Sequence, residues 1–327
     1  MKKFLQDLEK ELRKLNFSDE EIKEILADHE EMIEVAQNEG VEDEKLTEKF
    51  GNPEKLASDI YKSSIGGTSK MNEKVMGTGD TAGYSLFKSL PVLDEVKEVK
   101  IKLISEDLKF YPYDGENIEV YFKKVKDEDF YEVSYNDGVF QLNRDKSSKL
   151  LNMFSFGGDS GHIIVKVPTG IELNKFNVNV VSGDIEVNSI TSKGVQLKST
   201  SGDIELENIK VEKGEITTVS GDIELVDFYC KGNLSLSSVS GDYEVSKGSV
   251  EGDFVLHTVS GDFEIENVKA EYSSLQSVSG DIKGTEFYPT KVDLKSVSGD
   301  ISIKNNDKSH KIEVGRKKTL SGDISIK

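Results

Sequence analysis

The triplet Ser-Gly-Asp returns eight times in the C-terminal half of the chain, and this repeat constrains the fold more than any other feature. The triplets stand at 182–184, 201–203, 220–222, 240–242, 260–262, 279–281, 298–300 and 321–323. A unit of about 20 residues is too short to bury a core of its own, so neighbouring units must stack on one another. The repeat therefore predicts a rod of stacked laps, where a lap is one unit of the repeat.

Apolar residues keep fixed positions around each triplet and alternate with polar ones, as in a half-buried strand. The column directly after the triplet is Ile185, Ile204, Ile223, Tyr243, Phe263, Ile282, Ile301 and Ile324. The column four residues before the serine is Val178, Leu197, Ile216, Leu236, Leu256, Leu275 and Leu294. If each lap is one coil, like side chains stack about 4.8 Å apart. We predict a parallel β-solenoid, right-handed because parallel crossovers favour that hand.

The triplet is predicted to form the corner of each lap. Glycine supplies backbone freedom, and the serine and aspartate side chains can hydrogen-bond the amides of their own turn. This turn column comprises Ser182, Gly183, Asp184, Gly202, Asp203, Gly221, Asp222, Gly241, Asp242, Gly261, Asp262, Gly280, Asp281, Gly299, Asp300, Gly322 and Asp323. Lys-Gly pairs at 193–194, 213–214 and 231–232 predict a second corner.

The regular laps cover 171–327, and residues 86–170 resemble earlier laps that have lost regularity. Residues 101–112 have the shape of a repeat, with Ser105-Glu106-Asp107 where the triplet belongs. Further strands are expected at 118–125, 130–134, 140–143 and 162–167. The segment 144–160 is the longest expected excursion from the rod.

Residues 1–62 follow a helical period and predict a small all-α domain of four helices. Phe4, Leu5, Leu8, Leu12 and Leu15 form one apolar stripe in the first helix. The second helix begins after Ser18, and two shorter ones end the unit. Residues 63–85 are rich in glycine, serine and threonine, which is typical of a flexible linker.

Residues 1–62, which we call the head, resemble a known domain family. The segments FLQDLEKELRKL, SDEEIKEILADHEEMIEVAQNEG and EKLTEKFGNPEKLASDIY are similar to the HTH-associated α-helical signalling (HAAS) domain, which bacteria encode beside PadR-type transcription regulators. The most specific piece is Phe50-Gly51-Asn52-Pro53, followed by Leu56-Ala57 and Ile60-Tyr61. The resemblance implies that residues 1–62 bind a PadR-type regulator.

The rod carries a second resemblance. Columns that read S-V-S-G-D-I-x-V after a helical head are similar to the bacterial putative-adhesin domains of unknown function. These are β-solenoids of envelope-stress and surface proteins. The resemblance covers 86–327 and implies a link to envelope stress or a place on the cell surface.

Charge and composition exclude several classes. The 42 lysines and arginines stand against 61 aspartates and glutamates, a net charge of −19, which argues against direct nucleic-acid binding. The single cysteine, Cys230, cannot form an internal disulfide. The N-terminal residues show no signal-peptide pattern, and no stretch has the roughly 18 apolar residues of a membrane span. We expect a cytoplasmic protein, with a surface adhesin exported by another route as the alternative.

A column of glutamates is expected beside the triplet aspartates, at Glu186, Glu205, Glu224, Glu244 and Glu264. Calcium bridging these acidic columns is an alternative to turn aspartates bound by backbone amides. No motif for a catalytic, cofactor or metal site interrupts the repeat, and His29, His162, His257 and His310 are scattered. A carbohydrate-active β-helix is the lesser alternative.

The sequence therefore favours a non-enzymatic interaction or scaffold protein without a cofactor. Residues 304–327 carry seven bases and three acids, a net charge of +4. Lys317, Lys318 and Lys327 are interpreted as guards of the last strand against edge pairing. Homo-oligomers through this open C-terminal end, or docking of the acidic head there, are the alternatives.

Overall fold

The computed structural model describes residues 2–14, 22–23, 26, 53, 81–125, 128–144 and 161–327. The chain forms two compact units, Met1–Thr78 with Lys146–Asp159, and Gly79–Asp145 with Ser160–Lys327. Much of the first unit, most of the expected linker and the segment 145–160 lie outside the described residues. The second unit is the predicted rod.

The first predicted helix is confirmed as α1 (Lys2–Lys14). Phe4, Leu8 and Leu12 are buried along one face because residues three or four apart share a side of a helix. Of the later expected helices only Ile22, Lys23, Leu26 and Pro53 are described, and each has helical backbone.

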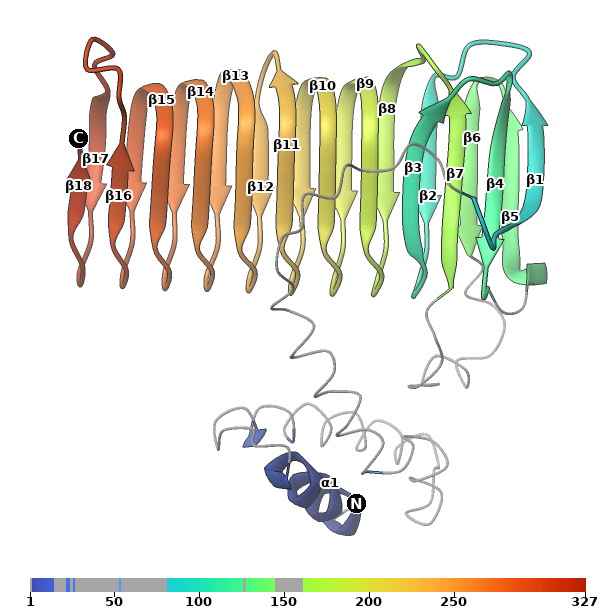
Figure 1. Cartoon of the computed structure of the whole chain (residues 1–327), viewed down its shortest axis with the longest axis horizontal. Coiled ribbons are helices and arrows are strands. Elements are labelled where there is room, and N and C mark those ends of the chain that lie inside the picture. The colour runs from blue at the N-terminus through green and yellow to red at the C-terminus, as the bar shows by residue number, and fades with distance from the viewer. Residues whose placement is uncertain are drawn as a thin grey trace. The chain divides into compact units, whose positions relative to one another are not determined.

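The second unit is built almost entirely of strands (Figure 1). The first group is β1 (Ser85–Pro91), β2 (Glu98–Lys102), β3 (Asp107–Tyr113), β4 (Asn117–Lys123), β5 (Tyr131–Asn136), β6 (Val139–Arg144), β7 (His162–Pro168) and β8 (Glu172–Asn179). The regular laps are β9 (Ile185–Lys198), β10 (Ile204–Thr217), β11 (Ile223–Cys230), β12 (Leu234–Ser237), β13 (Tyr243–His257), β14 (Phe263–Gln276), β15 (Ile282–Lys295), β16 (Ile301–Lys304), β17 (Glu313–Lys318) and β18 (Ile324–Ile326). One short 3-10 helix, η2 (Glu128–Phe130), precedes β5.

The laps stack in parallel and in register, which confirms the β-solenoid. Strand β10 pairs with β9 from Ile204 opposite Ile185 to Thr217 opposite Lys198, an offset of one repeat. The triplet serines continue the stack as isolated parallel bridges from Ser220 to Ser321. Figure 1 shows the laps from β9 to β18 stacked one after another along the rod. The right-handed winding stays a prediction.

The predicted apolar columns form the core. From Ile185 to Ile301 every member of the column after the triplet is at most 1% exposed, and the column from Val178 to Leu294 is at most 3% exposed. Burying one such side chain contributes about 1.5–3 kcal/mol. In the last lap Lys317 lies opposite Leu294, and Ile324 and Ile326 are half-buried, so the core thins there.

A corner that the sequence analysis missed lies five residues after each triplet aspartate. Its residues have positive φ in six successive laps: Ser189, Asn208, Asp227, Lys247, Asn267 and Glu286. Asparagine and aspartate tolerate this left-handed backbone better than most residues. Four of the six members are asparagine, aspartate or serine, which was the signal in the sequence. The Lys-Gly pairs at 193–194 and 213–214, where a corner was expected, lie inside β9 and β10.

Residues 86–170 differ from a simple run of earlier laps. Strand β3 lies between β7 and β9, and β2 lies between β6 and β8, so the order in the stack is not the order in the chain. Strands β1 and β5 pair antiparallel with β4 and β6 respectively, and β4 pairs antiparallel with β7. A local turn accounts for the antiparallel pair β5–β6: Asp137 and Gly138 both have positive φ, as a two-residue hairpin turn requires.

The glycine of each triplet is needed for close approach between laps. A Cβ atom on Gly241 would lie 2.1 Å from the carbonyl oxygen of Gly221, and the glycines from 202 to 322 all show the same contact with the preceding lap. This distance is far below van der Waals contact with a backbone atom that cannot move alone. Backbone freedom, the reason given by the sequence analysis, applies in addition at Gly280, Gly299 and Gly322, whose φ values are 149°, 136° and 125°.

We expect Gly241→Ala to lower the free energy of unfolding by about 2–3 kcal/mol, because the new methyl group forces two laps apart. Chemical denaturation of the full chain measures this change. Gly194→Ala is the matched control, since the atoms nearest to its Cβ are 3.7 Å away, and it should change stability by less than about 0.5 kcal/mol. Equal losses in both variants would contradict the role of the contact.

Candidate functional site

The triplet aspartates form a ladder of hydrogen bonds between laps. The backbone N–H of each aspartate donates to Oδ1 of the aspartate one lap earlier, at 3.0 Å from Asp203 to Asp184, 2.8 Å from Asp242 to Asp222 and 2.7 Å from Asp281 to Asp262. The pattern continues to Asp323. The sequence analysis expected bonds within one turn, but the carboxylates join neighbouring laps. We call this column the aspartate ladder.

The predicted glutamates stack beside it and form a glutamate ladder, Glu186, Glu205, Glu224, Glu244 and Glu264, in parallel register. A lysine stands at each end. Lys109 of β3 forms an ion pair with Glu186, and Lys283 of β15 forms one with Glu264 at 2.5 Å. The three inner glutamates therefore have other carboxylates, and no lysine, above and below them in the column.

The two ladders line an acidic groove of about 390 Å³ across four laps. Its walls carry eight carboxylates, Asp203, Asp222, Asp242, Asp262, Glu205, Glu224, Glu244 and Glu264. Ile204, Ile223 and Tyr243 complete its lining. The Tyr243 hydroxyl is already used, because it donates to the backbone carbonyl of His257 at 2.8 Å. Since the side chains of Ile204, Ile223 and Tyr243 are at most 1% exposed, the groove offers mainly carboxylate oxygens.

Burial and neighbouring charges raise the pKa of two glutamates in this groove. Partial burial, followed by the charges of Glu186 and Glu224, raises the pKa of Glu205 above its ordinary value. Burial, followed by Glu224 and Glu264, raises the pKa of Glu244 in the same way. The glutamate ladder thus holds negative charge that a cation near it would stabilise.

The arrangement is suited to attraction of positive charge over a length of several laps. General acid–base catalysis uses two groups in unlike environments. The groove instead repeats the same pair of side chains, one aspartate and one glutamate, in each of four laps. In the described part of the chain no group of three or more His, Cys, Asp or Glu side chains is arranged to hold a metal ion. The described histidines are apart: His162 pairs with Asp107 at 2.9 Å, and His310 contacts the carbonyl of Pro289 at 3.0 Å.

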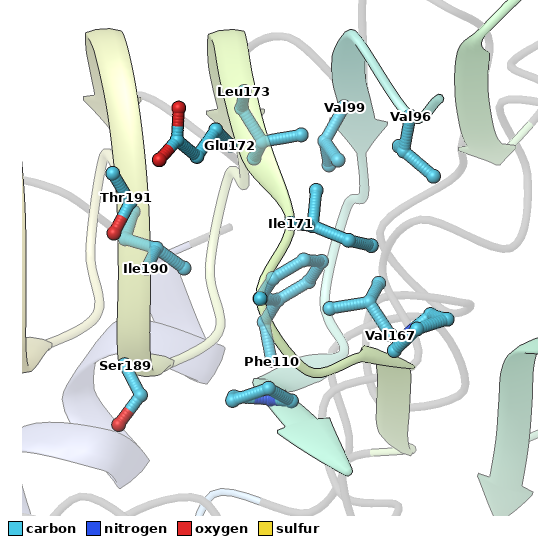
Figure 2. A pocket seen from close by; sticks show the side chains of 13 residues that line it. Val96, Val99, Phe110, Val167, Ile171, Glu172, Leu173, Ser189, Ile190 and Thr191 are labelled. Carbon is cyan, nitrogen blue, oxygen red and sulfur yellow. The ribbon is translucent and has the colours of Figure 1, made fainter. Parts of the chain in front are cut away.

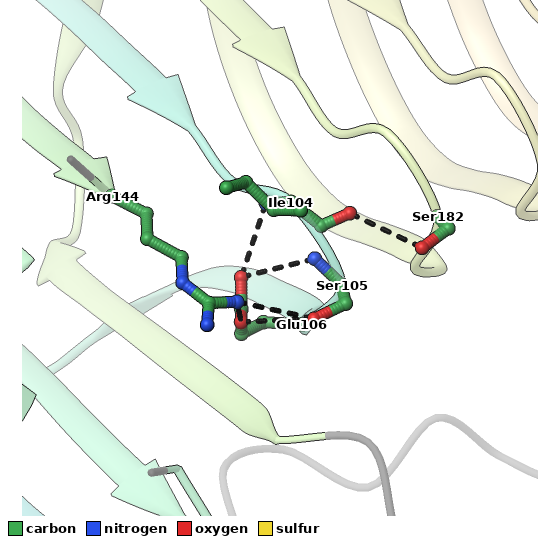
Figure 3. Close-up of polar contacts among 5 residues, drawn as sticks. All are labelled: Ile104, Ser105, Glu106, Arg144 and Ser182. Carbon is green, nitrogen blue, oxygen red and sulfur yellow. Dashed lines mark hydrogen bonds and ion pairs between the residues drawn. The ribbon is translucent and has the colours of Figure 1, made fainter. Parts of the chain in front are cut away.

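The N-terminal end of the triplet column is closed by Ser105-Glu106-Asp107. Figure 3 shows Ser105 and Glu106 of this segment with Ile104, Arg144 and Ser182. The backbone carbonyl of Glu106 lies where the preceding glycine would be, 2.3 Å from a Cβ on Gly183. The side chain of Glu106 is 4% exposed, accepts hydrogen bonds from the backbone N–H groups of Ile104 and Ser105, and pairs with Arg144. Asp107 starts the aspartate ladder by accepting from Asp184 N–H at 3.2 Å.

Sequence reasoning missed Arg144, which lies at the end of β6. A buried carboxylate needs a charged partner or several donors, and Arg144 provides that partner across 38 residues of sequence. The unusual Glu106 in place of glycine was the signal, since it puts a charge at a corner that is otherwise tightly packed. Only the hairpin β5–β6 brings the arginine to it.

Comparison with known families fits this geometry. The sequence pattern of the family described as Toastrack DUF4097 matches residues 96–255 and 231–327, nearly the whole rod. The chain belongs to the Toastrack DUF4097 family. A second pattern, that of HAAS, matches residues 3–59. The Toastrack chain therefore carries the fusion that its sequence suggested.

Three solved structures are similar to this chain. A protein described as a putative lipid binding protein from Parabacteroides distasonis is 18% identical, with 76% of this chain and 98% of that chain covered and a TM-score of 0.53. A putative adhesin from Parabacteroides merdae is 16% identical, with 77% and 98% covered and a TM-score of 0.49. A putative adhesin from Bacteroides fragilis is 21% identical, with 74% and 97% covered and a TM-score of 0.42.

The search of curated proteins finds no match to this Toastrack chain. Among its described residues, no helix has both the length and the apolar character needed to cross a membrane.

The aspartate ladder should be measurable in single variants. Asp222→Ala removes the acceptor for Asp242 N–H, and we expect the free energy of unfolding to fall by about 1–2 kcal/mol. Asp222→Asn keeps an acceptor oxygen at the same place and should lose much less. Denaturant titrations of both variants separate the hydrogen bond from the charge. A loss in Asp222→Asn as large as that in Asp222→Ala would contradict the ladder.

The raised pKa of Glu205 predicts a pH effect of known sign. A carboxyl group whose pKa is higher in the folded state binds its proton more tightly there. The free energy of unfolding of the wild type, relative to that of Glu205→Gln, should therefore rise as the pH falls from 7.5 toward the ordinary glutamate pKa of 4.5. At pH 7.5 Glu205→Gln should be more stable than the wild type, because it lacks a carboxylate that its neighbours repel. The difference should be at most about 1 kcal/mol, because solvent screens exposed charges.

Denaturant titrations at several pH values provide the measurement, and Glu212→Gln, at an exposed position outside the groove, is the control. A difference between wild type and Glu205→Gln that does not depend on pH would show that the ladder does not raise this pKa.

Proposed function

We propose that this Toastrack protein is a non-enzymatic scaffold whose acidic groove binds a basic protein segment. The observation that carries the proposal is the groove of about 390 Å³, in which eight carboxylates repeat with the lap spacing across four laps. An extended chain advances about 3.3 Å per residue, so a lysine or arginine at every second or third residue can meet successive laps. Such a segment would neutralise charges that the stack itself forces together.

The electrostatic repulsion between the stacked carboxylates favours binding of a positively charged segment. Neighbouring carboxylates about 4.8 Å apart repel by about 1 kcal/mol in water and by more where solvent is partly excluded. A basic segment offsets this repulsion with attraction. Part of the free energy of binding therefore comes from neutralising carboxylates that repel one another in the free rod. The lysines at the two ends of the glutamate ladder, Lys109 and Lys283, are examples of the same neutralisation within the chain.

We propose further that the HAAS head binds a PadR-type transcription regulator, which would make the protein a link between the groove's ligand and gene expression. The match of residues 3–59 to HAAS supports a protein-interaction role for the head.

A partner that acts on DNA favours a cytoplasmic location. A surface adhesin is the alternative, and cell fractionation with an antibody to the rod distinguishes the two. Self-association through β17 and β18 stays a prediction.

The groove is tested with a triple charge reversal, Glu205→Lys, Glu224→Lys and Glu244→Lys. We expect the full-length wild type to bind a fluorescent decalysine peptide and the triple variant to bind it at least tenfold more weakly, as measured by fluorescence anisotropy at 0.15 M salt. The control reverses Glu212, Glu251 and Glu271, which are exposed outside the groove. Screening over about 8 Å should limit its effect to less than threefold. Equal losses in both triples would assign binding to net charge and reject the groove.

The head is tested with Leu8→Asp in the full chain. Leu8 is fully buried in α1, so a charge there should disrupt the packing of the head. We expect binding of a purified PadR-type regulator, measured by calorimetry, to fall below detection in Leu8→Asp. The triple charge reversal in the groove should bind the regulator as the wild type does. Thermal unfolding of the rod should be unchanged in Leu8→Asp. Undiminished binding by Leu8→Asp would contradict the proposed role of the head.

A further inference from the structure

A separate apolar pocket of about 160 Å³ opens near the N-terminal end of the rod (Figure 2). Its walls include Val99 of β2, Phe110 of β3, Leu173 of β8 and Ile190 of β9, all at most 5% exposed. Ile171, half-buried, stands between them. None of these residues lines the acidic groove, so the pocket is independent of the proposed function.

The pocket lies where a column of buried side chains ends. In the regular laps the residue after the missed corner faces its equivalent one lap away, from Phe287 through Val268, Gly248, Phe228 and Ile209 to Ile190, and the Phe228 ring fills the space beside Gly248. Strand β3 does not make that corner, because it runs on to Tyr113 and pairs with β9 only from Leu108 to Phe110. Beneath Ile190 the register passes from β3 to β8, where Ile171, one residue before the pair Glu172–Thr191, is only half-buried, and a hollow remains beside it.

The chain between β7 and β8 keeps this hollow open on one side. Gly170, with a φ of 79°, turns the backbone after Pro168, and β8 then continues from Glu172, which pairs with Thr191. A Cβ on Gly170 would meet nothing within 4 Å, so the turn faces open space. The pocket is thus open to solvent beside Gly170, where the half-buried Ile171 is its accessible apolar residue.

The mouth of the pocket has one charge. Glu172 is exposed, and it is the only lining residue with a titratable side chain. Ser189 and Thr191 add hydroxyl groups on the same side, as Figure 2 shows. An apolar interior below a single carboxylate is complementary to an apolar group that ends in a cation.

We propose that this pocket binds a small primary amine whose apolar part has about five or six carbons. A dry apolar cavity of about 150 Å³ holds a molecule of the size of benzene, so the volume sets the upper limit on the apolar part. The ammonium group lies at the mouth, donates to the Glu172 carboxylate and keeps contact with water. Alcohols of the same shape bind more weakly, and carboxylates are repelled.

The test uses the full chain with ¹³C-labelled isoleucine and valine methyl groups, titrated with isopentylammonium, isopentanol and isovalerate. We expect the methyl signals of Ile171, Ile190 and Val99 to shift saturably with isopentylammonium, while those of Ile265, buried in a distant lap, stay unchanged. The dissociation constant should be at least fivefold larger for isopentanol, and isovalerate should give no saturation. Octylammonium, which is too long, should bind more weakly than isopentylammonium.

Three variants test the roles of the carboxylate and of the pocket wall. Glu172→Gln, at an exposed position that leaves the fold intact, should weaken isopentylammonium at least fivefold and leave isopentanol within twofold of wild type. Glu212→Gln is the matched control for loss of one negative charge and should change neither. Val99→Leu adds one methylene to the pocket wall and should weaken every probe.

Shifts that do not saturate, or that spread equally to Ile265, overturn the site. Equal affinity for the amine, the alcohol and the carboxylate overturns the role of Glu172 and with it the proposed ligand class. Since these readouts do not involve the acidic groove, decalysine binding can fail while amine binding succeeds, and the reverse.

Discussion

The contact between the glycine of one triplet and the carbonyl oxygen of the glycine one lap earlier fixes the spacing of the whole rod. A Cβ there would lie only 2.1–2.3 Å from that oxygen, so any side chain would push the laps apart. The aspartate ladder acts at the same place, because each carboxylate accepts the N–H of the next lap. Together they hold the corner in register, and the apolar columns can then stack like on like.

The same register determines the surface. Residues that follow the triplet by a fixed number of positions must form a column, whether apolar inside or acidic outside. The glutamate ladder is therefore a consequence of the repeat, and its repulsion of about 1 kcal/mol per neighbouring pair is smaller than the burial of one isoleucine per lap. Lys109 and Lys283 neutralise its two ends and leave the middle as an acidic groove.

The N-terminal laps show what happens where the repeat ends. The Asp137-Gly138 turn and the antiparallel strands β1, β4 and β5 replace parallel stacking, and the triplet column closes on Glu106 and Arg144. The departure of β3 from the lap path leaves the apolar pocket beside Ile190. Irregularity at this end thus supplies both a cap and a cavity, while regularity elsewhere supplies a uniform groove.

The sequence by itself determined the parallel solenoid, the buried columns and the first helix, because a 19- or 20-residue period and a helical stripe are local patterns that only one packing satisfies. It also placed Glu186 through Glu264 in one column. The tertiary structure alone decided the partners of the aspartates, the corner from Ser189 to Glu286, the Arg144 cap and the place of β2 and β3 in the stack. These depend on which segments meet across tens of residues, and a single sequence holds no direct record of such distances.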